Sequence, residues 1–116
     1  MLPPLESAKR VVFRTYRRNA KTRGLEFTLT LERFHELMTA RCQYCDIEPY
    51  LRTNKREAYG DYVHGGIDRV DNDEGYLSEN CVPCCPLCNH AKKNMTLEAF
   101  QSWIGRLVEF HQRKEQ

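Results

Sequence analysis

The sequence contains no long apolar run. Neither its first segment, MLPPLESAKRVV, nor any later stretch approaches the roughly 20 apolar residues that a transmembrane helix needs. The first segment also lacks the apolar centre of a secretory signal peptide. These absences predict an intracellular protein without a membrane partner, located in the cytoplasm, in the nucleus or nucleoid, or in a host cell if the gene is viral.

Acidic residues are scarce near the N-terminus. Only Glu6 accompanies seven lysines and arginines among residues 1–24, although the whole chain has a formal net charge of +2. Val12 and Tyr16 share one face of a helix predicted over 1–24, which Gly24 would end as a left-handed cap. The basic side chains of another face either contact phosphate groups or are simply solvated. These candidates are Arg10, Arg14, Arg17, Arg18 and Lys21.

Six cysteines are present in a chain of 116 residues. A domain this small buries a modest core and often needs a staple, for which a structural metal is one option. In an intracellular chain, cysteines are more often metal ligands than members of disulfides. The Cys-x-x-Cys spacing is also typical of metal knuckles, so a secreted disulfide scaffold is disfavoured.

Helices are predicted on either side of the cysteine-rich centre. Thr30 begins a helix over 30–41, because a threonine cap precedes an apolar stripe of helical spacing. The same Thr-Leu-Glu-x-Phe start returns at Thr96 and predicts a helix over 96–114. Within that last helix we expect Trp103 to pack in the core and His111 to be an exposed or boundary residue.

The central segment, 66–93, is predicted to form a strand, a loop, a second strand and a helix. The strand 67–71 lies between glycines and the turn sequence Asn-Asp-Glu-Gly that ends at Gly75. The strand 81–84 contains Pro83, which suits an edge, and Pro86 suits the first helical turn. The preceding residues, 46–65, are polar and indicate a loop, with a further strand over 59–63.

The central segment carries the motifs of a known family. They are Asp68-Arg69, Gly75-Tyr76, Asn80, Cys85-x-x-Cys88-Asn89 and Lys92. Together they resemble the HNH endonucleases, whose active site is a ββα-metal finger, and the upstream Cys42-Gln43-Tyr44-Cys45 matches the first zinc pair of zinc-stapled members. The resemblance implies an α+β fold, in which a small finger over 42–93 is flanked by helices in a single domain, 1–116.

Three cysteine pairs compete for a zinc site that needs four ligands. Cys81 and Cys84 lie three apart in an extended strand and point to opposite faces, so they cannot easily hold one ion. The pair at 85 and 88 spans a turn into a helix N-terminus, which favours the thiolate. The predicted zinc ligands are Cys42, Cys45, Cys85 and Cys88.

The other two cysteines then have no metal to hold. We expect Cys84 to be a packed thiol and Cys81 to be half-buried in the second strand. A second zinc ion would need additional ligands, such as His64 or His90.

The resemblance also implies a catalytic site. Asp68 corresponds to the first ligand of a catalytic Mg²⁺ or Mn²⁺ ion, and Asn89 corresponds to the second. Both supply hard oxygen atoms, which suit these ions better than zinc. Asn80 corresponds to an asparagine that braces the loop, while Lys92 and Lys93 lie where phosphate could be met.

The sequence departs from the family at Arg69, where the general-base histidine usually stands. An arginine stays protonated and cannot be a general base at neutral pH. Three alternatives follow. His64 replaces the base, or the metal activates water while Arg69 clamps the phosphate, or the finger binds without catalysis.

The resemblance therefore predicts a divalent-metal-dependent endonuclease that hydrolyses phosphodiester bonds of DNA and contains a structural zinc. One alternative is a catalytically inactive zinc module that binds DNA or RNA through the basic helix and the lysines at 92 and 93. Another is a protein-interaction module that uses residues 46–64 as its contact surface.

Overall fold

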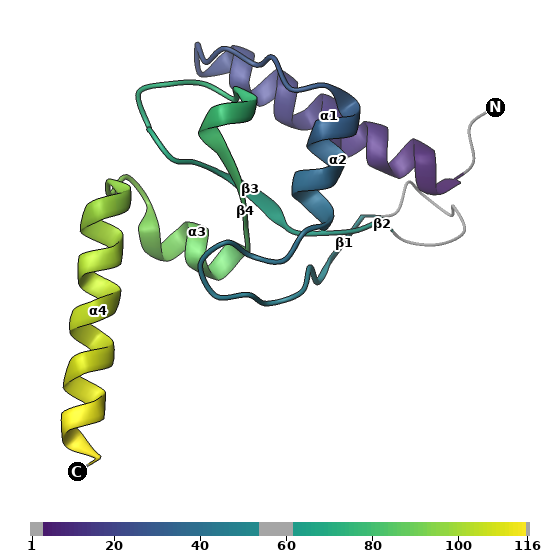
Figure 1. Ribbon diagram of the computed structural model, residues 1–116. Coiled ribbons are helices and arrows are strands. Elements are labelled where there is room, and N and C mark those ends of the chain that lie inside the picture. Colours follow the sequence, from purple (N-terminus) through teal and green to yellow (C-terminus); the bar gives the residue numbers. More distant parts are fainter. Residues whose placement is uncertain (1–3, 54–61, 116) are drawn as a thin grey trace.

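The computed structural model describes residues 4–53 and 62–115 and has an α+β fold, as predicted (Figure 1). The elements in chain order are α1 (Pro4–Thr22), α2 (Leu31–Thr39), β1 (Leu51–Thr53), β2 (Tyr62–His64), β3 (Gly66–Arg69), the short 3₁₀ helix η1 (Ser78–Asn80), β4 (Cys81–Cys84), α3 (Pro86–Lys92) and α4 (Leu97–Lys114). The strand predicted over 59–63 overlaps β2, and its residues 59–61 lie outside the described residues. None of the described helices combines the length and the apolar character that crossing a membrane requires.

The helices begin and end at the caps that the sequence indicates. The Thr30 hydroxyl accepts a hydrogen bond from the Arg33 backbone N–H at 3.1 Å, and Thr96 caps α4 in the same way. Gly24 has φ of +71° just beyond α1, a conformation that suits glycine. The Leu25 N–H then donates to the Ala20 carbonyl at 2.8 Å, which closes a Schellman-type end.

Strands β3 and β4 form the antiparallel hairpin of the finger, and α3 follows β4 directly. Ile67 pairs with Pro83 and Asp68 pairs with Val82, while β1 and β2 form a separate two-stranded sheet. Figure 1 shows α3 next to the β3–β4 hairpin, with α1 and α2 toward its other side. This order, two strands and then a helix, is the one predicted from the sequence.

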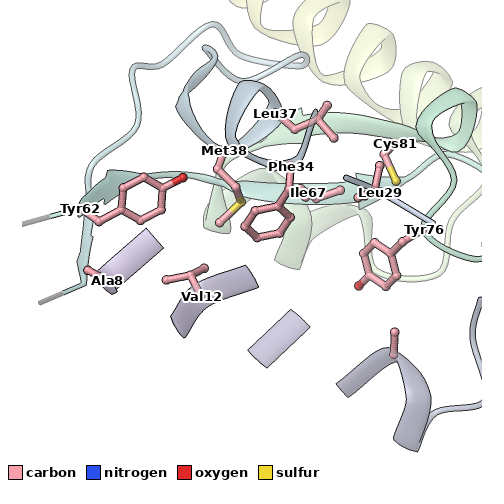
Figure 2. Close-up of a cluster of buried hydrophobic side chains, with 11 residues drawn as sticks. Ala8, Val12, Leu29, Phe34, Leu37, Met38, Tyr62, Ile67, Tyr76 and Cys81 are labelled. Atoms are coloured by element: carbon pink, nitrogen blue, oxygen red, sulfur yellow. The ribbon is translucent and has the colours of Figure 1, made fainter. Parts of the chain in front are cut away.

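The core lies where α1 and α2 pack against the β3–β4 hairpin (Figure 2). Phe34 of α2 is fully buried at its centre, and the ring of Tyr16 packs edge-on against it, with the ring centroids 5.2 Å apart. Ile67 of β3 belongs to this core. Because successive strand residues point to opposite faces, Asp68 is directed away from the core and toward α3.

Helix α4 extends away from this body (Figure 1). Phe100 is its buried residue, whereas Leu107, Val108 and Phe110 are exposed. The expectation that Trp103 packs in the core is not met, because its ring is half-exposed and lies beside Phe100, with centroids 6.2 Å apart. The apolar stripe of α4 thus extends well beyond the surface that the rest of the described chain covers.

Gly75 allows two backbone segments to approach closely. A Cβ atom at this position would press on the Glu26 carbonyl oxygen and lie 2.7 Å from the Glu26 nitrogen. The approach lets the Tyr76 N–H donate to the Glu26 carbonyl at 2.8 Å, and Phe27 forms a β-bridge with Tyr76. The sequence explains Gly75 by a turn, whereas the structure shows that this close contact also requires it.

Replacing Gly75 by alanine is expected to lower the free energy of unfolding by about 1–3 kcal/mol, because the obstructing atoms are backbone and cannot rotate away. Gly105→Ala is the control, since a Cβ there meets nothing within 4 Å and a helix gains up to about 1 kcal/mol from the change. Chemical denaturation measures both variants. A Gly75→Ala protein as stable as the wild type would contradict the close contact.

Candidate functional site

The structure brings together the four cysteines that the sequence assigns to zinc. The Sγ atoms of Cys42, Cys45, Cys85 and Cys88 all lie within 4.8 Å of one another. Cys42 and Cys45 follow α2, and Cys85 is the N-cap of α3, where its Sγ accepts from the Cys88 N–H at 3.4 Å. Four thiolates at this spacing could hold a zinc ion, and they would then tie together segments 40 residues apart.

Electrostatics favour the thiolate at Cys42, whereas burial raises the pKa of Cys88 in the same cluster. Although burial raises the pKa of the Cys42 thiol, backbone N–H groups of residues 85, 44 and 45 lower it to about 7. Burial raises the pKa of Cys81 to about 11 and that of Cys84 further still, so both stay protonated. Cys84 is a packed thiol as expected, but Cys81 is buried rather than half-buried, because it joins the core under α2.

A second zinc site through the histidines is not formed by the described residues. His64 is buried between β1 and Gly65, and its Nε2 and Nδ1 lie 2.9 Å from the Thr53 hydroxyl and 2.8 Å from the Gly65 carbonyl. The carbonyl can only accept, so Nδ1 donates to it. Both ring nitrogens are therefore occupied, and His90 is exposed at the surface of α3.

A pocket of about 310 Å³ lies beside the finger. Its lining comes from β3, the loop after it, α3 and the end of α1. The lining residues are Arg23, Ile67, Asp68, Arg69, Asn72, Tyr76, Asn89, Lys93 and Asn94. Three of the four catalytic candidates from the motif (residues 68, 69 and 89) meet here, together with two further cationic side chains, Arg23 and Lys93.

Asp68 is buried and held by two neighbours. Its Oδ2 accepts a hydrogen bond from the Tyr44 hydroxyl at 2.7 Å and lies 3.2 Å from Lys92 Nζ. Lys92 is fully buried, so the expectation that it contacts phosphate is wrong. An ammonium in that position compensates the Asp68 charge, which is costly to bury alone.

Asn89 and Asn80 have different tasks. The Asn89 Nδ2 donates a long hydrogen bond of 3.4 Å to the Ile67 carbonyl, so the nitrogen of the Asn89 amide faces β3. Asn80 is buried, and its Nδ2 donates to the carbonyls of Asp71 and Gly75 at 3.0 and 2.9 Å. Its Oδ1 accepts from the Asp71 N–H at 2.8 Å, so Asn80 spans the loop between β3 and β4.

Arg69 is fixed at the pocket wall. Its Nη1 donates to the carbonyls of Asn72 and Glu74 at 2.8 and 2.6 Å, and its guanidinium lies 5.6 Å from the centre of the Tyr76 ring. These contacts hold a planar cation that carries further N–H donors. His64, the proposed replacement base, does not line this pocket.

The basic helix contributes one residue that the sequence analysis does not single out. Arg23, just beyond α1, lines the pocket, because the Gly24 cap ends the helix there. Arg10 is partly buried and pairs with Glu6 at 3.4 Å, which weakens its case for phosphate contact. The other candidates are exposed: Arg14, Arg17, Arg18 and Lys21.

Tyr44 is a second residue that sequence reasoning passes over. It lies inside the first Cys-x-x-Cys motif and appears there as a spacer. Burial, followed by the hydrogen bond to the Asp68 carboxylate, raises the pKa of Tyr44 far above its usual range, so its hydroxyl stays protonated. The available signal in the sequence was an aromatic hydroxyl between two predicted zinc ligands, Cys42 and Cys45.

Comparison with known proteins agrees with this geometry. The solved structure of the rare-cutting HNH restriction endonuclease PacI is similar to the chain with a TM-score of 0.59 and 22% identity, over 84% of this chain and 80% of that one. The chain has an HNH-type fold. The resemblance inferred from the motifs is therefore confirmed at the level of fold.

The sequence comparisons add a viral relative. An uncharacterized protein of Acanthamoeba polyphaga mimivirus is 38% identical to the chain over 85 residues, which are 73% of the present chain. The match spans 14% of the viral protein. No family model matches the chain. The HNH-type fold thus rests on the structure and on the cysteine cluster.

Proposed function

We propose that the protein is a divalent-metal-dependent HNH-type endonuclease that hydrolyses phosphodiester bonds of DNA. One observation carries the proposal: within an HNH-type fold, Asp68 of β3 and Asn89 of α3 line the same pocket as three cationic side chains. Oxygen donors beside cations are what hydrolysis of an anionic diester requires.

Asp68 and Asn89 fit a small divalent cation by their chemistry. Asp68 Oδ2 accepts a hydrogen bond from the Tyr44 hydroxyl, and Oδ1 accepts a long one of 3.4 Å from Lys92, so each oxygen keeps further acceptor capacity. The amide of Asn89 uses its nitrogen toward Ile67, which leaves its oxygen for a ligand. Mg²⁺ or Mn²⁺ bound by these oxygens would supply a Lewis acid for the scissile phosphate.

The cationic residues would bind and orient the phosphate. Arg69 is the clamp, because its contacts to Asn72 and Glu74 fix the guanidinium before any substrate arrives. Arg23 and Lys93 flank the same pocket, and the exposed basic face of α1 leads away from it. The duplex would thus lie along α1 with one phosphate at the pocket.

The cysteine cluster would hold a structural zinc rather than a catalytic one. All four positions of a tetrahedral site would be filled by Cys42, Cys45, Cys85 and Cys88, with none left for water or substrate. The cluster instead joins the end of α2 to the start of α3 and so places Asn89 beside β3.

Asn89→Ala is expected to reduce Mg²⁺- or Mn²⁺-dependent plasmid nicking about a hundred-fold or more, since the metal contributes several kcal/mol to such reactions. The control is Asn94→Ala, an exposed residue of the same pocket to which no ligand role is assigned. Asp68→Asn should also abolish nicking. Because this change removes the charged partner of the buried Lys92 and destabilises the fold, the variant must be assayed below its melting temperature.

The same assay distinguishes the proposed nuclease from the alternative function. A module that binds nucleic acid without cleaving it is favoured by one observation, the ion pair in which Lys92 already neutralises Asp68. That module would show salt-sensitive binding of DNA or RNA and no nicking with either metal. A folded, zinc-loaded wild type that behaves so would overturn the nuclease proposal.

A further inference from the structure

Tyr44 connects the cysteine cluster to the pocket. Its backbone lies between Cys42 and Cys45, and its N–H donates to Cys42 Sγ at 3.5 Å. Its side chain leaves the knuckle and donates from the hydroxyl to Asp68 Oδ2 at 2.7 Å, across 24 residues of sequence. One residue therefore contacts both the first half of the cluster and the carboxylate of β3.

The second half of the cluster reaches the same carboxylate through α3. That helix begins at Cys85, and Lys92 near its end places Nζ 3.2 Å from Asp68 Oδ2 and 3.4 Å from Oδ1. The Asp68 carboxylate thus receives one contact from each side of the cluster. A donor on each oxygen, Tyr44 on Oδ2 and Lys92 on Oδ1, restricts rotation of the carboxylate.

The Tyr44 ring has little freedom to move. It is half-buried and packs edge-on against Phe100 of α4, with centroids 5.1 Å apart and an interplanar angle of 87°. The backbone on its other side is held by the knuckle. The hydroxyl is therefore directed at Asp68 by packing, in addition to the hydrogen bond itself.

We propose that Tyr44 is a positioning residue for Asp68, through which the cysteine cluster sets the orientation of the carboxylate that would bind the divalent cation. The inference rests on the proposed function, because it assigns that cation to Asp68. Groups that hydrogen-bond a metal ligand fix its orientation, and losing one usually weakens metal binding about 10- to 100-fold. Tyr44 touches neither the cation nor the substrate in this role.

The test is the Mn²⁺ affinity of the zinc-loaded Tyr44→Phe protein, measured from the electron paramagnetic resonance signal of free Mn²⁺. Phenylalanine keeps the ring packing on Phe100 and removes only the hydroxyl. We expect Mn²⁺ to bind about ten-fold more weakly. Nicking should fall at low Mn²⁺ and return at saturating Mn²⁺, whereas a merely structural defect would lower it at every concentration.

Tyr62→Phe is the matched control. The Tyr62 hydroxyl is also hydrogen-bonded, at 3.0 Å to His35 Nδ1, but it lies in the core away from the pocket lining. Its removal should leave Mn²⁺ affinity unchanged. A folded Tyr44→Phe protein with wild-type affinity would overturn the inference, and so would an equal loss in Tyr62→Phe. If the wild type does not bind Mn²⁺, or if Asp68→Asn does not abolish the binding, both the proposed metal site and the inference are wrong.

Discussion

Replacing Cys85 by serine is expected to leave most of the domain unfolded at room temperature. Structural zinc contributes about 10–16 kcal/mol in small zinc domains, whereas whole domains are stable by only about 5–15 kcal/mol. Serine is a good N-cap and should keep the hydrogen bond that Cys85 accepts from the Cys88 N–H. The loss would therefore report the missing metal ligand and not a broken helix start.

Thermal melting followed by circular dichroism measures this effect, with zinc content determined in parallel. Cys81→Ser is the matched control, because Cys81 is equally buried but lies outside the four-sulfur cluster. It should melt cooperatively, retain zinc and lose about 1–3 kcal/mol for its buried hydroxyl. Excess chelator should unfold the wild type. A cooperative melt of the wild type in chelator would show that the cluster does not stabilise the fold.

Lys92→Met is expected to lower the free energy of unfolding by about 3–5 kcal/mol, the usual effect of removing one partner from a buried ion pair. Methionine nearly matches the volume of the lysine stem, so little packing is lost. The variant leaves the Asp68 carboxylate buried, with Tyr44 as its remaining hydrogen-bond donor among the described residues. Denaturation with guanidinium measures the change.

Two further proteins separate charge from packing in this experiment. Lys93→Met alters the neighbouring residue, which is exposed, and should change stability by no more than about 0.5 kcal/mol. The double variant Asp68→Asn/Lys92→Met removes both charges and should recover much of the loss, giving a coupling energy from the cycle. Lys92→Met with wild-type stability would mean that the two charges do not depend on each other.

Local features of the fold could be predicted because neighbouring residues decide them. Thr30 and Thr96 cap the following turn, and Gly24 adopts a conformation that glycine favours, so the ends of α1, α2 and α4 are encoded nearby. The choice of cysteines followed similar reasoning, since side chains three apart in a strand diverge while those at a helix start converge.

Features that depend on contacts between distant segments could not be predicted. The sequence places Lys92 one turn beyond Asn89, on what reads as an exposed helix, but α3 packs on β3 and carries the ammonium to Asp68. Arg23 enters the pocket because α1 ends beside the finger. The apolar spacing around Trp103 predicts burial, yet periodicity does not say whether another element covers that face.

Helix α4 also has a mechanical consequence, because it is held near one end. Its 18 residues span about 27 Å at about 1.5 Å per residue, so turning it by about 10° about its first turn moves the far end by about 5 Å. Phe100 lies near that pivot and presses on the ring of Tyr44. Because the Tyr44 hydroxyl donates to Asp68, tilting α4 from its far end would shift the Tyr44 ring and, through it, the Asp68 carboxylate.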